Sequence, residues 1–473
     1  MHLRVISPAV VVMFMAAVAL AAEPPTRASS GVIDVLVDGE HCRGAHVSTR
    51  PHNRKVVYHE DSGTWFVFYG TGHWTEAEGE AGAAKENLLW RASADGGVTW
   101  GPAQLASDGN GHSSSACAVL WGDRVFLSNT RWGYWRRKAG IPALIDGKAF
   151  YKSSKPGVAM YYVPYDVHAF RIEGGKLLPD GGPYEALPGD QHVMHAGPHY
   201  GSMCRDGNGY LWVAARALMG DPPTLAAWVA RSTGPDDPSA WEPHSVIYHS
   251  PGPGTVAPQV VALAGGRVGC MVYSKHDKAT YFLLFDAESG VWSEPLVVGR
   301  ESGRSKRTCA AVDPGTGRLH FVYIDENEDA RHRYCEAPYG PGDWVPAPEE
   351  PGVLVARSAG SNSADDDLTL SVRGSKSPAP LALVHRGTDQ RLHLKYYDGT
   401  AWHPQDVPIG LQDPKFTCDE ATAIEDFSHG LGFAYWCRWA DRAEDERHNS
   451  IGMIRFCRVD DVAALFEGIE DQE

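Results

Sequence analysis

Histidine, arginine and tyrosine residues recur in the Gly- and Pro-rich segments of this sequence, and these three types can together carry out acid–base chemistry on an anion. His112 stands in "DGNGHSSS", and His199 and Tyr200 stand in "QHVMHAGPHYGS". An imidazole or a phenol can remove one proton and supply another, while a guanidinium can pair with a carboxylate. We therefore predict His112, His199 and Tyr200 as the catalytic residues of a site for an acidic substrate.

Further cationic and aromatic residues lie in the same kind of segment. Arginine forks suit carboxylate or sulfate, and aromatic rings pack on the apolar faces of pyranoses. An anionic sugar combines both features. The predicted substrate-binding residues are Arg50, Arg54, His73, Arg131, Trp132, His195, Arg307, Arg386 and Arg438.

A repeat of about fifty residues supplies the elements that must position these side chains, and periods of this length indicate a solenoid or a propeller. A Trp followed closely by Pro recurs, as in "TWGP" at Trp100 and "DWVPAP" at Trp344. Seven segments pair two β-rich runs across a Gly, Asp or Asn turn. We predict an all-β, seven-bladed β-propeller, whose last blade takes a strand from residues 31–37. The loop that enters each innermost strand and the loop that leaves the second strand then open on one face.

The segment "SADGGVTW" resembles the Asp-box of the sialidase-like propellers, with Ser93, Asp95, Gly97, Thr99 and Trp100 at the fixed positions. The resemblance implies a tight hairpin between the outer strands of a blade. True sialidases have six blades, which is the alternative fold. A count of seven resembles instead the propeller enzymes that attack uronic-acid polysaccharides, such as the ulvan lyases and the rhamnosyl-glucuronate lyases.

Three functions remain open from the sequence. A polysaccharide lyase would break a uronate by β-elimination, with Arg131 and Arg307 on the carboxylate. A sialidase-like hydrolase would need two carboxyls facing the sugar. Arg50 could be the first of its carboxylate-binding arginines, but the apolar residue expected between this arginine and Pro51 is missing. A glycan-binding propeller without catalysis would keep the arginines and aromatic rings. The carboxyls available to a hydrolase are Glu76, Asp325, Glu326 and Asp413.

The spacing of His192, His195 and His199 also permits a structural metal, although we predict no metal in the catalytic site and no cofactor. The insertion that follows Arg131, rich in Trp, Arg and Lys, is expected to cover one side of the pocket.

The first residues indicate export. Residues 1–22 have a short basic start, an apolar core and small residues at Ala19-Leu20-Ala21, typical of a cleaved signal peptide. We expect a secreted or periplasmic monomer, with one propeller domain over residues 31–460 and an acidic tail over 461–473. A net charge of −16 disfavours nucleic acid, and no later apolar run predicts a membrane span.

The chain has nine cysteines, an odd number. Cys437 and Cys457 are predicted as the disulfide, because they fall on neighbouring strands. Four others occupy similar positions in successive repeats, where small apolar residues are expected, and we interpret them as packing residues: Cys117, Cys204, Cys309 and Cys418.

Overall fold

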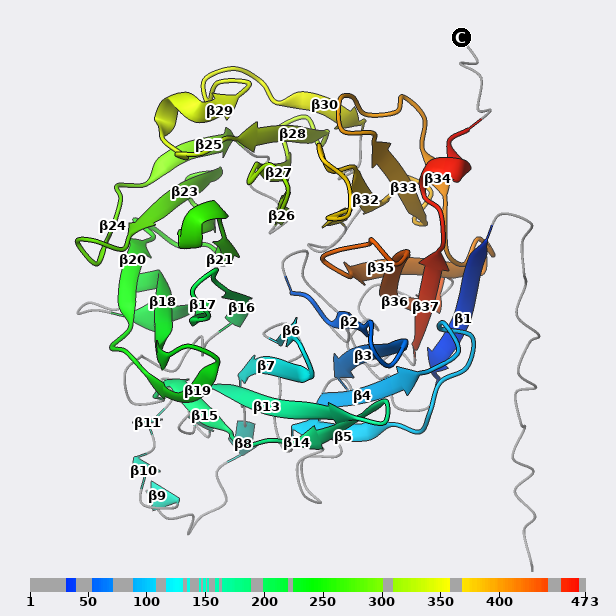
Figure 1. Cartoon of the computed structure of the whole chain (residues 1–473). Coiled ribbons are helices and arrows are strands. Elements are labelled where there is room, and N and C mark those ends of the chain that lie inside the picture. Colours follow the sequence, from blue (N-terminus) through cyan, green and yellow to red (C-terminus); the bar gives the residue numbers. More distant parts are fainter. Residues whose placement is uncertain are drawn as a thin grey trace, which may run out of the picture.

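Seven antiparallel β-sheets stand around a central axis in the computed structural model, and each sheet is one blade of a β-propeller (Figure 1). The sequence prediction of seven blades rather than six is confirmed. The structure describes residues 31–39, 53–70, 88–107, 116–130, 134–136, 144–145, 148–149, 151–152, 158–160, 164–188, 199–219, 224–300, 309–357, 368–440 and 452–467.

Each blade has four main strands, which in blades 1 to 6 are ordered from the axis outward as in the chain, and some blades pair a further strand with the third. Blade 1 holds β2 (Val56–His59), β3 (Thr64–Gly70), β4 (Leu88–Ser93) and β5 (Gln104–Ser107). Blade 2 holds β6 (Cys117–Trp121), β7 (Arg124–Thr130), β13 (Tyr165–Glu173), β14 (Lys176–Pro179) and β15 (Tyr184–Leu187). Blade 3 holds β16 (His199–Arg205), β17 (Leu211–Met219), β18 (Thr224–Gly234), β19 (Asp237–Trp241) and β20 (Ser245–His249).

The remaining blades repeat this order. Blade 4 holds β21 (Val256–Ala262), β22 (Val268–Ser274), β23 (Ala279–Asp286), β24 (Val291–Trp292) and β25 (Leu296–Arg300). Blade 5 holds β26 (Cys309–Val312), β27 (Leu319–Ile324), β28 (Ala330–Cys335), β29 (Trp344–Val345) and β30 (Val353–Ala356). Blade 6 holds β31 (Leu368–Val372), β32 (Leu381–Arg386), β33 (Leu392–Tyr397) and β34 (Val407–Pro408). Three short 3-10 helices are also described: η4 (Ala264–Gly266), η5 (Pro341–Asp343) and η7 (Ala463–Leu465).

Blade 7 joins the two ends of the described chain. Its inner strands are β35 (Phe416–Ala423), β36 (Leu431–Trp439) and β37 (Met453–Val459), and its outer strand is β1 (Val32–Asp38). The pairing of β1 with β37 is the one expected of residues 31–37. Closure of this kind leaves the ring without open sheet edges between its first and last blades.

The second strand of a blade is buried on both faces, because a neighbouring blade packs on each side. All seven residues of β3, "TWFVFYG", and of β22, "VGCMVYS", are buried. These strands therefore read as continuous β-rich runs rather than as alternating polar and apolar residues.

Several of the recurrent tryptophans pack against the preceding blade. Trp344 of blade 5 lies edge-on to Phe282 of blade 4, with ring centroids 5.3 Å apart. Trp292 of blade 4 contacts Trp212 of blade 3 in the same way, at 6.1 Å. Trp100 of blade 1 packs on Phe456 of blade 7 at 5.0 Å, so the same device closes the ring.

The segment "SADGGVTW" forms the turn between β4 and β5, the two outer strands of blade 1. Asp95 accepts hydrogen bonds from the Thr99 backbone nitrogen at 2.9 Å and from its hydroxyl at 2.6 Å. Ser93 donates to Asp95 and accepts from the Gly97 nitrogen. Gly97 has a φ of 91°, and a Cβ there would overlap Phe456. The turn therefore shapes the fold and carries no site chemistry.

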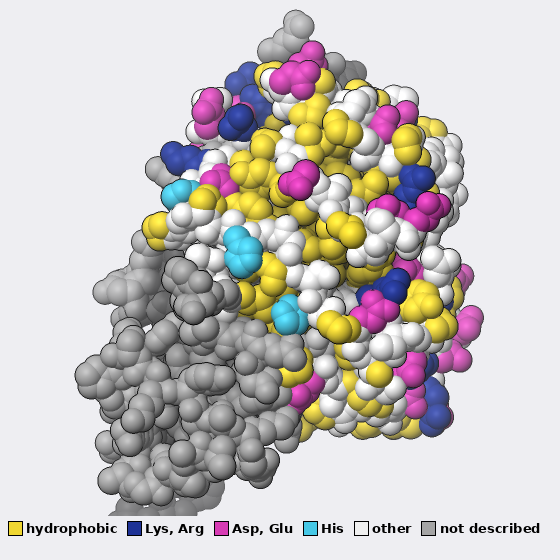
Figure 2. Space-filling view, turned by 90° about the vertical axis from the view of Figure 1, so that its left-hand side faces the viewer, with side chains coloured by type: hydrophobic (Ala, Val, Ile, Leu, Met, Phe, Trp, Pro, Cys, Tyr) yellow, Lys and Arg dark blue, Asp and Glu magenta, His cyan; other side chains and the backbone are white. Residues whose placement is uncertain are grey.

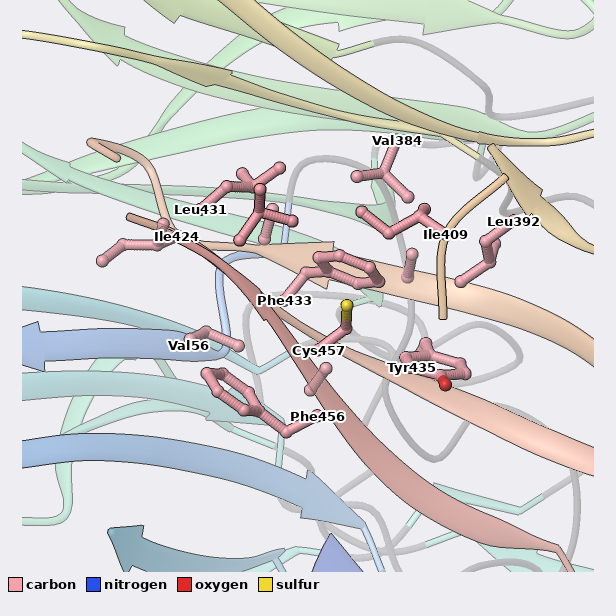
Figure 3. Packing of buried hydrophobic residues seen from close by; sticks show 14 of the residues in the cluster. Val56, Val384, Leu392, Ile409, Ile424, Leu431, Phe433, Tyr435, Phe456 and Cys457 are labelled. Atoms are coloured by element: carbon pink, nitrogen blue, oxygen red, sulfur yellow. The ribbon is translucent and has the colours of Figure 1, made fainter. Parts of the chain in front are cut away.

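The predicted Cys437–Cys457 disulfide is wrong. Cys437 lies opposite Met453 in the register of β36 and β37, while Cys457 lies opposite Phe433, so the two cysteines are well separated along the strands. The Cys457 sulfur lies among the apolar side chains of the core (Figure 3). The structure bridges none of the described cysteines, and the sulfur that contacts Cys437 is that of Cys418, at 2.9 Å.

Two segments extend the ring. The insertion after Arg131 leaves from the second strand of blade 2 and contains β8 (Tyr134–Arg136), β9 (Leu144–Ile145), β10 (Lys148–Ala149), β11 (Tyr151–Lys152) and β12 (Val158–Met160). At the other end, Phe466 is buried against Tyr396 and His403 of blade 6. On the outer side shown in Figure 2, acidic and basic side chains are interspersed with apolar ones.

Candidate functional site

The seven innermost strands all start on the same face of the ring, here called the loop face; they end on the opposite one, the turn face. In the described registers, the start of a first strand pairs with the end of the second strand of the same blade. His199 lies opposite Arg216, Leu368 opposite His385, and Thr417 opposite Arg438. The predicted arginines at the ends of second strands therefore do lie beside the starts of first strands.

Asn53 and Arg54 directly precede the buried residue before β2 and lie near the axis, at the loop-face end of the innermost strands. The Asn53 side-chain amide donates to the Gly201 carbonyl of blade 3, and the Asn53 carbonyl accepts from the Thr422 hydroxyl of blade 7 at 2.7 Å. Asn53 is fully buried. Through its side chain and its backbone, Asn53 thus connects blade 3 to blade 7 across the axis.

Arg54, predicted to bind substrate, spans the axis instead. Its guanidinium donates to the carbonyls of Ala310 in blade 5 and Ala423 in blade 7, and to the Thr369 hydroxyl in blade 6. It is 6% exposed. Arg54 therefore connects three other blades by hydrogen bonds and has a structural role in the ring.

On the blade 3 side of the site, Arg216 and Tyr200 form a cation–π interaction. The Arg216 guanidinium carbon lies 4.3 Å from the centroid of the Tyr200 ring. Tyr200 has a φ of 54°, and the pairing of β16 with β17 is irregular between His199 and Ser202. A β-bulge changes the direction in which a side chain points. A left-handed backbone conformation is strained for any residue other than glycine, and such strain is found more often at functional sites.

Gly201 permits this conformation. A Cβ at this position would overlap the phenol oxygen of Tyr165, which donates to the Ser128 hydroxyl at 3.0 Å. Burial raises the pKa of Tyr165 well above its usual range, so this phenol stays protonated. Tyr200 also packs with Ala257 and Tyr273 of blade 4.

The blade 6 and blade 7 side brings two predicted arginines together. Arg386 and Arg438 both reach the same oxygen of Asp419, at 3.6 Å and 3.7 Å. Arg386 also donates to Gln390, in the turn that follows β32. All three charged side chains are buried, so the low dielectric strengthens their attraction.

Sequence reasoning missed Asp419 and its neighbour Glu420. Glu420 has a φ of 56° and lies in a second bulge, between Asp419 and Thr422. The signal was present, because "TCDEATA" places two acidic residues in an innermost strand where small apolar residues are expected. Blades 3 and 7 therefore carry matching bulges at the loop face, both tied to Asn53.

A third missed residue is Asn129 near the end of β7, two positions before the predicted Arg131. Its carboxamide is fully buried, and neither its oxygen nor its nitrogen has a hydrogen-bond partner within the described part of the chain. It lies opposite Asp166 in the register of β7 and β13.

Several predicted residues fall elsewhere. The backbone of His199 begins β16, beside Arg216. Asp325, one of the hydrolase carboxyls, accepts hydrogen bonds from Arg331 on β28 at 2.8 Å and from the backbone of Asn327 and Asp329 in its own turn. Outside the described residues lie Arg50, His73, Glu76, His112, Arg131, Trp132, His192, His195 and Arg307.

A group able to hold a metal ion is found on the turn face. His59, Asp61 and Asp123 offer ligand atoms that all lie within 4.8 Å of one another. His59 is already bonded to the Asp123 carboxylate at 3.0 Å and to the Ser62 hydroxyl at 2.8 Å. The group therefore also works as an ordinary bridge between blades 1 and 2.

A cavity of about 740 Å³ opens on the turn face, lined by first-strand residues and hairpin turns. Its wall is apolar, with residues such as Val57, Leu120 and Ile424, and its rim carries carboxylates such as Glu60 and Glu425. Among the lining residues that the structure describes, Arg54 is the one Lys or Arg. An acidic rim disfavours an anionic sugar, so the loop face is the better candidate for such a ligand.

No protein-family model and no curated protein matches the chain. Among solved structures, polysaccharide lyase Uly1 superposes with a TM-score of 0.47 at 9% identity, over 92% of this chain and 94% of that one. The NanB sialidase from Streptococcus pneumoniae has a TM-score of 0.43 at 11% identity, covering 90% of this chain and 70% of that one. The Aleuria aurantia lectin AAL has a TM-score of 0.41 at 12% identity, covering 70% and 93%. Within the described residues, none of the helices has the length and apolar character needed to cross a membrane.

Proposed function

We propose that the loop face binds acidic, uronate-containing glycans and that the protein cleaves them by β-elimination. The observation that carries this proposal is the Tyr200–Arg216 pair, in which a guanidinium lies 4.3 Å from the centroid of a phenol ring held on a bulged, left-handed inner strand. Arg386 and Arg438 lie at the same face, where both contact Asp419.

The reaction needs three groups. A base removes the proton at C5 of the uronate, the electron pair forms a double bond between C4 and C5, and the bond from C4 to the leaving oxygen breaks. A cation neutralises the uronate carboxylate while charge develops, and an acid protonates the leaving oxygen. We assign Tyr200 to proton transfer and Arg216 to the carboxylate. His112 and His199 are the proposed partners in proton transfer, with Arg131 and Arg307 as further carboxylate ligands.

The remaining assignments belong to the same proposal. We propose that residues 1–22 are a signal peptide and that the mature, monomeric protein acts outside the cytoplasm. N-terminal sequencing of the exported protein and its mass in solution would test both statements. A start at residue 1 or a stable oligomer would contradict them.

An activity screen tests the reaction. The purified protein is incubated with a panel of acidic polysaccharides while the ultraviolet absorbance of the unsaturated uronate product is followed. The proposal predicts a rise with at least one uronate polymer, abolished in Tyr200→Phe and kept in Tyr58→Phe, a tyrosine at the turn-face end of β2. New reducing ends without absorbance would indicate a hydrolase instead, and binding without either product a lectin-like propeller.

A further inference from the structure

Two buried cysteines face each other beneath the loop-face site. Cys418 of β35 and Cys437 of β36 are directly opposite in the strand register, and their sulfur atoms are 2.9 Å apart. Both side chains are fully buried. Directly opposed residues of antiparallel strands have Cα atoms about 4.5–5.5 Å apart, which falls within the range that a disulfide spans.

The geometry points to a cross-strand disulfide between Cys418 and Cys437, and we propose this bond as a covalent modification of blade 7. It replaces the Cys437–Cys457 pairing, which the strand register rules out. The proposal is independent of the enzymatic function, since it depends on the geometry of β35 and β36 alone.

The bond forms by exchange with a disulfide oxidant such as oxidised glutathione. One cysteine thiolate attacks the oxidant, a mixed disulfide forms, and the first glutathione thiol leaves. The second cysteine then attacks the mixed disulfide and releases the second glutathione thiol. The protein loses two hydrogens in total, and one glutathione disulfide becomes two thiols.

Exchange must precede the closure of blade 7. Burial raises the pKa of Cys437 well above its usual range, so the folded protein holds little of the reactive thiolate, and neither sulfur is accessible to an oxidant. The bond therefore forms during folding, while β35 and β36 pair and the outer part of the blade is still open.

The bond would stabilise the loop-face site. Asp419 follows Cys418 and Arg438 follows Cys437, and these two charged residues contact each other at 3.7 Å. A cross-link at the preceding residues fixes the strand register from which both side chains project. It also closes a loop of the unfolded chain between positions 19 residues apart, which restricts the unfolded state.

The full chain tests this directly. It is refolded from denaturant in a buffer of reduced and oxidised glutathione, unfolded again, alkylated with iodoacetamide and digested without reduction. Mass spectrometry should find one peptide pair joined through Cys418 and Cys437, lighter by two hydrogens than the separate peptides. Alkyl groups on both residues, or either residue joined to a different cysteine, would overturn the proposal.

A stability comparison provides the second measurement. The Tm of the wild type should be higher in the oxidised than in the reduced form, and the matched variant Cys457→Ala should keep this difference. Cys437→Ala should lose it. An equal difference in Cys437→Ala would overturn the proposal, and if that variant does not fold, the peptide map of the wild type decides.

Discussion

The Asn53 side-chain amide donates a hydrogen bond to the Gly201 carbonyl, and so joins the entrance of blade 1 to the bulge of blade 3. The Asn53 carbonyl accepts from Thr422, beside the bulge of blade 7. Tyr200 and Glu420, the two left-handed residues in the described innermost strands, are therefore positioned through one shared, fully buried residue.

Removal of this side chain should destabilise the fold. Asn53→Ala leaves the Gly201 carbonyl without its buried donor, and we expect a loss of about 1–3 kcal/mol in the free energy of unfolding. Urea denaturation measures this. Asn208→Ala, at an exposed position in the turn of blade 3, should change the free energy by less than about 0.5 kcal/mol. Equal effects of the two variants would contradict the bridging role.

Tyr200 should matter for turnover more than for stability. Loss of a general acid or base typically lowers the rate about 10²–10⁴-fold, so Tyr200→Phe should reduce kcat by that order on any uronate polymer the protein cleaves. Steady-state kinetics and the circular dichroism of the variant check this. A kcat within twofold of the wild type would remove Tyr200 from the mechanism.

Asp419 should contribute strongly to the stability of the fold, because it neutralises two buried arginines. Asp419→Asn removes the negative charge that both Arg386 and Arg438 contact, and breaking a buried ion pair on one side costs about 3–5 kcal/mol. The matched control is Asp460→Asn, because Asp460 pairs with Arg458 at 2.6 Å at the exposed end of β37. That surface pair should contribute less than about 1 kcal/mol. Urea midpoints that shift equally in both variants would argue against the buried cluster.

Two stacked histidines should make the fold acid-sensitive. The Nδ1 atom of His320 lies 3.0 Å from the Nε2 atom of His332, and both rings are buried between blades 5 and 6. Burial lowers the pKa of His320 from 6.5 to about 3 and that of His332 well below its usual value. Below pH 6.5 the unfolded chain therefore binds protons that the folded chain does not bind.

The stability contributed by this pair should fall as the pH drops from about 6.5 towards 3, by up to about 1.4 kcal/mol per pH unit for each histidine. Urea unfolding at a series of pH values measures the slope. The double variant His320→Gln/His332→Gln should have a flatter slope, and the exposed His249→Gln should match the wild type. An unchanged slope in the double variant would mean that other groups control the acid response.

The repeat made the architecture predictable from the sequence, whereas the contacts across the axis could not be predicted. The Trp–Pro period and the hairpin turns are local signals, and they gave the number of blades and the role of residues 31–37. The partners of Asn53 and Arg54 lie 148 to 369 positions away in the sequence, so no local pattern reveals them. This is why Arg54 was predicted to bind substrate although its guanidinium is held by three other blades.

The same distinction explains the other differences. Arg386 and Arg438 were recognised because second-strand ends must meet on one face, but their shared partner Asp419 depends on the register of β35. The Cys437–Cys457 prediction failed for the same reason, since adjacent strands do not specify which residues lie opposite.

Hydrogen–deuterium exchange with and without an acidic uronate oligosaccharide tests most directly whether the loop face is the functional face. We predict slower amide exchange on binding in β16, at residues 199–205, and at the start of β35, at residues 416–420. Exchange at the turn-face cavity, in residues 56–61 and 312–317, should stay unchanged. Protection confined to those turn-face segments would contradict the account and would move the binding site to the cavity at the opposite end of the axis.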